Sequence, residues 1–451
     1  MSKINPISGF PEYLPADRIV EQHFLDVIRE VFELHGFSSI ETRSVEPIDR
    51  LSAQGEDTDK EIYAVSRLAA GQELDTTGSS REPRLGLHFD MTVPFARYVL
   101  ENAGRLNFPF RRYQIQKAWR GERPQEGRYR EFTQADIDVV DVGKLSPHFE
   151  AEIPLVIADV FSQLPIGEYL IQVNNRKIPE GFYLGIGLSD VARTLRIVDK
   201  LDKVGPAAVR TMLTAAGATD EQAGQCLALA EIRTPDTTFV DRVRQLGVGH
   251  ATLDEGLAAL TAVIEAGVAT APGKLVADLR IARGLDYYTG TVYETQLVGY
   301  ESWGSFCSGG RYDALASDGR NAYPGVGISI GVSRLIGLLV GKGLVTASRS
   351  TPACVLIGLV SDDSRVRSSM IAKSLRDRGI ACEVAPSAAK FGKQIRYAER
   401  RGIPYVWFPG DSQDALSGDV KDIRSGQQVT ASASEWTPPA VDLKPSLHFS
   451  R

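Results

Sequence analysis

The chain has 451 residues, of which 43% are hydrophobic and 24% are charged, and its formal net charge is −6. This composition is close to that of an ordinary soluble globular protein, and the length allows two to four domains at roughly 150 residues each. The overall charge therefore does not indicate a nucleic-acid partner, although a local basic patch stays compatible with one.

The patterns of cysteine, histidine and apolar residues argue against several further classes of protein. The four cysteines lie far apart with no C-x-x-C pair, which predicts reduced thiols of a cytosolic protein. The six histidines do not cluster with cysteines or carboxylates at ligand spacing, which argues against a structural zinc ion. The N-terminal sequence lacks an apolar signal region, and Arg334 and Lys342 interrupt the apolar segment 325–345, so we expect neither a secretory signal nor a membrane span.

The first predicted element is a helix at residues 17–35, where apolar residues recur at helical spacing between Asp17 as N-cap and Gly36 as stop. A strand is expected in FSSIETRSVEP (37–47), and a surface hairpin or loop at 69–81. The segment RLGLHFDMTVPFARYVLEN then predicts a strand that turns into a helix at Pro94.

Residues 111–140 predict two long strands joined by a short loop that contains glycine and proline. Along the second strand the residue types alternate, with Ala135, Ile137 and Val139 on one face and Phe132, Gln134, Asp136 and Asp138 on the other. At the edge of a sheet the polar face would be wetted, whereas inside a sheet it would form the floor of a polar pocket. A helix at 153–164 is expected to pack on the back of this sheet.

The rest of the chain changes character twice. Residues 175–265 are rich in alanine and leucine and predict a helical insertion, and strand patterns resume at 275–297 and continue to 335. After a linker at 341–351, a β-α-β-α-β order predicts a small domain with a parallel or mixed sheet, followed by a strand pair in VKDIRSGQQV. Between residues 352 and 410, ten Lys and Arg stand against five Asp and Glu, which fits a solvated helix surface and an RNA-facing patch equally well.

Three clusters carry candidate chemistry. The loop of the hairpin holds four arginines, Arg120, Arg123, Arg128 and Arg130. Their guanidinium groups either present forks to a carboxylate or phosphate, or form surface ion pairs that contribute little. The order in RIARGLDYYTGTVYE (280–294) places two tyrosines next to each other, so at most one of them is expected to face a pocket. The glycines of GVGISIGVSRL (325–335) fit neither common nucleotide-binding fingerprint, but glycines in a strand make room for a flat ligand.

These three stretches together resemble a known family. AWRGERPQEGRYREFTQADID resembles motif 2 of the class II aminoacyl-tRNA synthetases, and GVGISIGVSRL resembles motif 3. ARGLDYYTGTVYE is similar to the signature of histidyl-tRNA synthetases within that class. FDMTVPFARY resembles a eukaryote-like form of the family's amino-acid-binding loop, with Asp90 where the commoner bacterial form has Glu. Motif 1 is the weakest match, because the expected proline is shifted or missing and Pro47 comes late.

The resemblance covers nearly the whole chain and implies an α+β fold. It implies a class II synthetase catalytic domain with an antiparallel sheet, in two parts at 1–174 (motifs 1 and 2) and 269–341 (histidine signature and motif 3). A helical insertion at 175–268 separates the two parts, and an anticodon-binding α/β domain follows at 350–451. The resemblance further implies a cytoplasmic homodimer.

The implied activity is ATP-dependent activation of L-histidine to histidyl-adenylate, followed by transfer to the 3′ end of tRNA(His). Because two anions must meet in the first step, cationic donors are needed. By resemblance, Arg120 holds the α-phosphate and the substrate carboxylate, Arg283 stabilises the transition state, and Arg334 covers adenine and reaches the γ-phosphate. Phe132 would stack under adenine and Glu122 would accept from its amino group, and Mg²⁺ is expected to accompany ATP.

The histidine side is implied in the same way. Asp90, Thr92 and Gln134 match the residues that hold the α-amino group, and Asp138 and Tyr288 match those that hold the imidazole. A buried carboxylate opposite an imidazole N–H rejects substrates that lack this donor. The loop at 125–127 is placed to meet the acceptor end of tRNA. Asp136 shares the face but receives no role, and the tail after residue 410 receives none either.

Two alternative hypotheses assign the chain to other functional classes. The regulatory subunit of ATP-phosphoribosyltransferase shares this catalytic fold and binds histidine without charging tRNA. The presence of Arg120, Arg283, Arg334 and a basic α/β segment at 352–410 favours the enzyme over this regulator. A synthetase-like chain with a different cellular role would be separated from both by a charging assay.

Overall fold

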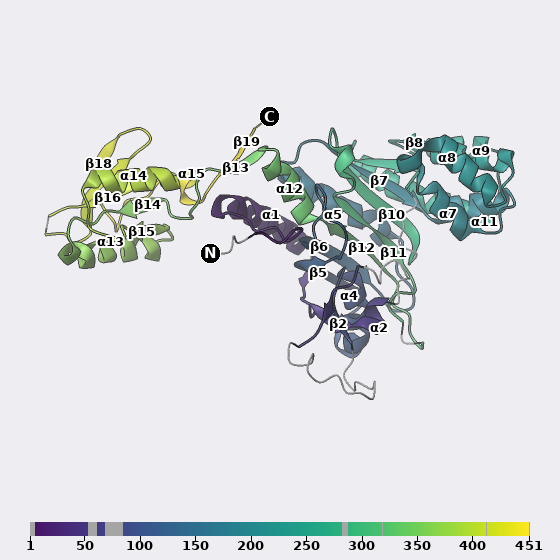
Figure 1. Ribbon diagram of the computed structural model, residues 1–451, viewed down its shortest axis with the longest axis horizontal. Helices are drawn as coiled ribbons and strands as arrows, with labels where there is room; N and C mark the ends of the chain where they lie inside the picture. Colours follow the sequence, from purple (N-terminus) through teal and green to yellow (C-terminus); the bar gives the residue numbers. More distant parts are fainter. Residues whose placement is uncertain are drawn as a thin grey trace. The chain divides into compact units, whose positions relative to one another are not determined.

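The computed structural model describes residues 5–52, 61–67, 84–281, 287–317, 319–411 and 413–450 (Figure 1). The loop predicted at 69–81 and the signature residue Arg283 lie outside the described residues. The chain forms two compact units, the first from residues 1–11 and 24–337 and the second from residues 12–23 and 338–451. None of the helices in the described part of the chain has both the length and the apolar character needed to cross a bilayer.

A mixed sheet that is mainly antiparallel forms the centre of the first unit (Figure 1). Its strands follow the order β1-β5-β6-β12-β11-β10-β7-β9-β8. All neighbouring strands run antiparallel except β1 with β5 and β7 with β9. The strands are β1 (Ser38–Ser39), β5 (Phe110–Trp119), β6 (Glu131–Val140), β7 (Tyr169–Asn175), β8 (Arg233–Thr234), β9 (Leu275–Asp278), β10 (Tyr288–Leu297), β11 (Cys307–Tyr312) and β12 (Gly325–Ile330). The predicted class of sheet is confirmed.

One face of this sheet is covered by helices. Helix α5 (His148–Gln163) packs against β12, and the Tyr293 hydroxyl of β10 donates a 2.6 Å hydrogen bond to the Glu150 carbonyl of this helix. The apolar side of β6 faces the same way, because Ile137 and Tyr293 lie in one cross-strand row, and Ile137 is fully buried. The predicted helix on the back of the hairpin is therefore confirmed. Helix α1 (Pro15–Leu34) matches the prediction for 17–35.

Six helices occupy the segment between β7 and β9, with β8 between two of them. They are α6 (Lys177–Gly185), α7 (Val191–Val198), α8 (Leu201–Ala215), α9 (Asp220–Ala230), α10 (Phe239–Gln245) and α11 (Ala251–Thr270). Helix α11 packs on α6, α5 and β7, so this helical segment is joined to the central sheet within the first unit.

The segment 37–47 differs from the prediction of a single strand. It forms β1 in the central sheet and β2 (Val45–Pro47) in a small sheet with β4 (Leu85–Leu87) and β3 (Ala64–Val65). Between β1 and β2, the Ile40 amide still donates to the Tyr113 carbonyl of β5. The side chains of Gln114 and Gln116 then bind Thr42, by donating to its hydroxyl and its carbonyl. Helix α2 (Ile48–Leu51) follows β2, and helix α4 (Thr92–Asn102) begins two residues before Pro94.

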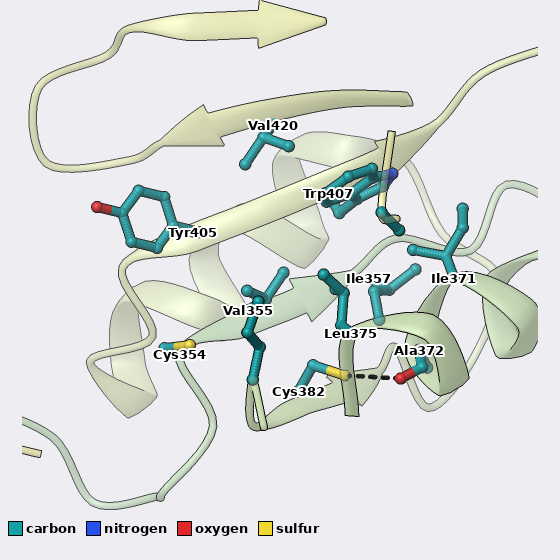
Figure 2. Close-up of a cluster of buried hydrophobic side chains, with 12 residues drawn as sticks. Cys354, Val355, Ile357, Ile371, Ala372, Leu375, Cys382, Tyr405, Trp407 and Val420 are labelled. Atoms are coloured by element: carbon teal, nitrogen blue, oxygen red, sulfur yellow. Dashed lines mark hydrogen bonds between the residues drawn. The ribbon is translucent and has the colours of Figure 1, made fainter. Parts of the chain in front are cut away.

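The second unit holds a five-stranded sheet in the order β15-β14-β16-β17-β18, with β14 parallel to both β15 and β16. Its elements are β14 (Val355–Ile357), α13 (Arg365–Asp377), β15 (Cys382–Val384), α14 (Phe391–Arg401), β16 (Tyr405–Pro409), β17 (Ser417–Asp422) and β18 (Gln428–Ser432). Fully buried Trp407 packs among Ile357, Ile371 and Val420 (Figure 2). The predicted β-α-β-α-β order and the later strand pair are both confirmed. Outside this sheet, β13 (Val345–Ala347) pairs with β19 (Leu447–Phe449), and α15 (Ala440–Leu443) precedes β19.

Candidate active site

The polar face of the β5–β6 hairpin lies inside the central sheet, between β1 and β12, and not at its edge. Residues paired across neighbouring strands point to the same side. The pairing places two rows on this face. One row is Gln114, Asp136, Ser329, Ser308 and Glu294, and the other is Arg112, Asp138, Gly327, Gly310 and Val292. Of the two alternatives that the sequence left open for this hairpin, the structure has the interior one. We call the polar side chains of these two rows the floor.

A buried ion pair lies in the second row. The Arg112 Nη2 atom lies 2.6 Å from Asp138 Oδ2, with both side chains almost completely shielded from solvent. The pair is an electrostatic contact and not an aligned hydrogen bond, because the geometry at the Arg112 nitrogens gives them no hydrogen-bond acceptor among the described residues. The guanidinium also lies 4.3 Å from the ring centroid of Phe95, which is a favourable cation–π distance.

Asp138 is held on both sides. Its Oδ1 accepts a 2.8 Å hydrogen bond from the Tyr312 hydroxyl, while Oδ2 faces Arg112. Burial raises the pKa of Asp138 to about 6, although Arg112 and the Tyr312 hydroxyl act in the opposite direction. The carboxylate is therefore ionised at neutral pH and fixed in orientation before any ligand arrives.

Two further buried carboxyl groups belong to the same site. Burial raises the pKa of Asp136 to about 7, and the neighbouring Asp138 and Asp90 add to the rise while Arg112 and Ser329 oppose it. Burial also raises the pKa of Asp90, against the hydrogen bond from the Val93 amide and the charge of Arg120. These mutual effects show that Asp90, Asp136 and Asp138 lie within electrostatic reach of one another.

The remaining residues predicted for histidine lie around this floor. Gln134 Nε2 donates a 2.8 Å hydrogen bond to the Ser329 hydroxyl, and Thr92 is the first residue of α4. Tyr288 is buried beside Gly310, where an added Cβ would lie 2.7 Å from the tyrosine ring. The expected opposite orientation of the two tyrosines is wrong, because the ring centroids of Tyr287 and Tyr288 lie 4.6 Å apart. Tyr287 precedes β10, so strand alternation does not apply to it.

The residues predicted for the nucleotide lie at the end of β5 and in the hairpin loop. Arg120 Nε donates to the Phe89 carbonyl at 3.0 Å, and its guanidinium lies 5.1 Å from the ring centroid of Phe132. Glu122 forms an ion pair of 3.2 Å with Arg128. The Arg–Glu pairing expected for a surface loop therefore applies to Arg128, while Arg120 is directed toward the floor residues.

Arg334 of helix α12 (Val332–Gly341) fastens the hairpin loop. Its Nε donates to the Gly127 carbonyl at 2.9 Å and its Nη1 to the Ser305 carbonyl at 2.5 Å. Burial lowers the pKa of Arg334, and the positive charges of Arg128 and Arg120 add to this effect. Arg334 thus links the loop to the chain that follows the short 3₁₀ helix η4 (Glu301–Trp303) and lies within electrostatic reach of Arg120.

The structure brings most predicted residues together and adds two that the sequence reasoning missed. Arg112 and Tyr312 both contact Asp138. The signal for Arg112 was present in FRRYQIQKAW, because strand alternation places it on the same face as Gln114 and Gln116. Tyr312 gave no such signal, since its position depends on the pairing of β11 with β12.

Comparisons with known proteins agree with this architecture. The family model described as histidyl-tRNA synthetase matches residues 9–335, and the model of the anticodon binding domain matches residues 353–437. A histidine–tRNA ligase from Micrococcus luteus is 59% identical, over 99% of each chain. One from Cutibacterium acnes is 54% identical, again over 99% of each chain.

Solved structures give the same result. The crystal structure of histidyl-tRNA synthetase from Nostoc sp. PCC 7120 superimposes with a TM-score of 0.83 at 35% identity, covering 96% of this chain and 98% of that one. A protein from Bacillus halodurans, described as an ATP phosphoribosyltransferase regulatory subunit/histidyl-tRNA synthetase, shares the fold with a TM-score of 0.71. Its identity is 18%, with 87% of this chain and 96% of that chain covered.

The antiparallel sheet with a charged floor, followed by an α/β unit, defines an aminoacyl-tRNA synthetase of class II. Within this class, the chain belongs to the histidyl-tRNA synthetase family.

Proposed function

We propose that the chain is a histidine–tRNA ligase that activates L-histidine with ATP and transfers it to the 3′ end of tRNA(His). The activity is that of an aminoacyl-tRNA ligase, with ATP as a substrate. The observation that carries the proposal is Asp138, a buried carboxylate fixed between Arg112 and Tyr312 on the same polar floor that Arg120 approaches. Such a group suits an imidazole N–H, and the arginine suits the anions of the activation step.

In the activation step, an oxygen of the histidine carboxylate attacks the α-phosphorus of ATP and pyrophosphate leaves. We propose that Arg120 binds the α-phosphate and the substrate carboxylate, and that Arg283 and Arg334 stabilise the remaining phosphate charge. Preorganised cations of this kind lower the barrier because they need no rearrangement while charge develops. Phe132 would supply the ring that stacks under adenine, and Glu122 the acceptor for its amino group.

On the amino-acid side, Asp90, Thr92 and Gln134 would hold the α-amino group, and Asp138 and Tyr288 the imidazole. The electrostatic coupling of Asp90 to Arg120 supports this arrangement, because it places an ammonium acceptor near the arginine proposed for the carboxylate. Both ends of one amino acid would then be held between oppositely charged groups.

Several wider features belong to the same proposal. Mg²⁺ would enter with ATP. Phosphate oxygens of ATP and water would supply ligands of the ion. We further propose a cytoplasmic homodimer with catalytic parts at 1–174 and 269–341, a helical insertion at 175–268 and an anticodon-binding domain at 350–451.

Exchange of radioactive pyrophosphate into ATP tests the activation step directly. We expect exchange that depends on histidine and not on other amino acids, and charging of tRNA(His) when tRNA is added. Histidine binding without exchange would instead identify a regulator of the ATP-phosphoribosyltransferase kind. Exchange without charging would separate the activation step from the tRNA step.

Gly127→Ala is expected to slow exchange about tenfold, because the added Cβ must displace the loop that Arg334 holds, and forcing an extra methyl group into filled space costs on the order of 1–3 kcal/mol. Gly127 has φ +73°, and an added Cβ would lie 2.6 Å from Cε3 of Trp303. Gly143→Ala is the matched control, because Gly143 has φ +70° and nothing within 4 Å of an added Cβ. Equal exchange rates in the two variants, measured with saturating ATP and histidine, would contradict the role of this loop.

A further inference from the structure

Asp136 occupies the centre of the proposed histidine pocket. It alternates with Gln134 and Asp138 on one face of β6, where same-face positions follow at about 6.8 Å. Gln134 is proposed for the α-amino group and Asp138 for the imidazole. A ligand that contacts both of these residues must therefore pass over Asp136.

The hydrogen-bonding state of Asp136 differs from that of its neighbours. Asp138 Oδ1 accepts from the Tyr312 hydroxyl while Oδ2 lies in the ion pair with Arg112, and Asp90 Oδ1 accepts from the Val93 amide. In contrast, three acceptors are buried and have no hydrogen-bond partner among the described residues: Asp136 Oδ1, Gln134 Oε1 and, opposite Asp136 on β5, Gln114 Oε1. Leaving a buried acceptor unpaired costs free energy, so these neighbouring unpaired acceptors indicate a place for a ligand that brings several N–H donors.

The charge balance points in the same direction. The groups that face Asp136 are Arg112 and Gln114 from β5, Asp138 from β6, Ser329 from β12, and Asp90 before α4. Arg112 is already paired with Asp138, and Asp136 itself forms no ion pair within the described ranges. The three carboxyl groups thus exceed the buried positive charge, and an incoming cation would restore the balance.

We propose that Asp136 is a specificity-determining residue of the histidine pocket, whose unpaired Oδ1 accepts a hydrogen bond from the α-ammonium group of the substrate. This inference rests on the proposed function and gives Asp136 a role in the site. The ammonium group suits Asp136 better than the imidazole does, because it carries a full charge and three donors, enough to reach both Asp136 and Gln134.

The assignment implies that histidine binding releases a proton from the protein. Burial raises the pKa of Asp136 to about 7, so near this pH a large part of the empty protein carries the proton on Asp136. The ammonium group favours the ionised carboxylate, and the displaced proton passes to solvent while the substrate keeps its own. Asp138, with a pKa of about 6, contributes less at this pH.

The test compares Asp136→Asn with wild type in titrations of histidine and of 3-(imidazol-4-yl)propionate, which lacks the amino group. We expect Asp136→Asn to weaken histidine binding about 10- to 100-fold, as for loss of a hydrogen bond to a charged group. We expect binding of the analogue to change less than about threefold by the same reasoning. Asp141→Asn is the matched control for loss of one carboxylate, because Asp141 follows β6 and accepts a hydrogen bond from the adjacent Val142 amide.

Calorimetry at pH 7 in two buffers of different ionisation enthalpy supplies a second readout, the number of protons released on binding. Histidine should release more protons than the analogue, and Asp136→Asn should abolish this difference. Equal weakening of both ligands would assign Asp136 to the imidazole, and unchanged binding with unchanged proton release would remove it from the pocket. Either result overturns this inference alone, whereas failure of wild type to bind histidine or exchange pyrophosphate overturns the proposed function.

Discussion

Replacing Arg120 with alanine is expected to slow histidine-dependent pyrophosphate exchange about 10³-fold, while the protein stays folded. Loss of one preorganised donor to a developing anion costs about 10²–10³ in rate, and loss of an arginine that neutralises a phosphoryl group costs about 10³–10⁵. The side chain is half-buried, and its contacts with the fold are a 3.0 Å hydrogen bond to the Phe89 carbonyl and a cation–π contact with Phe132, so the fold loses little.

Exchange rates at saturating histidine and ATP measure this effect, and circular dichroism checks the fold. Arg123→Ala is the matched control, because Arg123 lies exposed in the same loop and should leave exchange without tRNA unchanged. Arg120→Lys should recover only part of the rate, since an ammonium group lacks the two-pronged geometry of guanidinium. A rate for Arg120→Ala within threefold of wild type would remove Arg120 from the activation step.

The second large effect is expected at Asp138. Asp138→Ala removes the only carboxylate that forms an ion pair with the buried Arg112 guanidinium among the described residues, and removing one partner of a buried pair costs about 3–5 kcal/mol of unfolding free energy. The imidazole would also lose its proposed acceptor, so the KM for histidine should rise by about 10²-fold or more. Urea unfolding and exchange kinetics measure the two effects separately.

A double variant separates stability from recognition. Replacing both partners of a buried ion pair with apolar residues is often neutral or stabilising, so Arg112→Met with Asp138→Leu should regain most of the lost stability. Histidine recognition should stay lost in this variant. If the double variant instead activates histidine with a normal KM, Asp138 does not bind the imidazole.

Recognition should also depend on pH. Burial raises the pKa of Asp138 from its ordinary value to about 6, so its ionised form is lost as the pH falls through 6 and the acceptor for the imidazole weakens. A rise in the KM for histidine below this pH, less marked in Asp138→Asn, is the expected profile.

The sequence was sufficient to predict the hairpin and the strands and helices of the second unit, because both depend on local patterns. The alternation in EFTQADIDVV predicted which residues of β6 lie on the apolar face of the sheet and which lie on the floor. The order of apolar strands and amphipathic helices after residue 352 likewise predicted β14 to β16 with the helices between them. Such features need no knowledge of distant contacts.

The features that the sequence did not reveal depend on contacts between distant segments. At the break between β1 and β2, Gln114 and Gln116 bind Thr42, which lies more than seventy residues earlier in the chain. The pairing of Arg112 with Asp138 follows from the register of the hairpin, and the approach of Tyr287 to Tyr288 from where β10 begins. Strand alternation determines the face of a side chain but not its partner.

The glycines of β11 and β12 set a limit for anyone who wishes to redesign this enzyme. At Gly327 an added Cβ would lie 2.0 Å from Asp138 Oδ1, and at Gly310 it would lie 2.7 Å from the Tyr288 ring. This part of the floor of the proposed histidine site is formed by backbone without side chains. No side chain can therefore be shortened there to admit a larger amino acid. Altered substrate ranges will have to come from β5, β6 or the loop before α4, where side chains and not the main chain set the boundary.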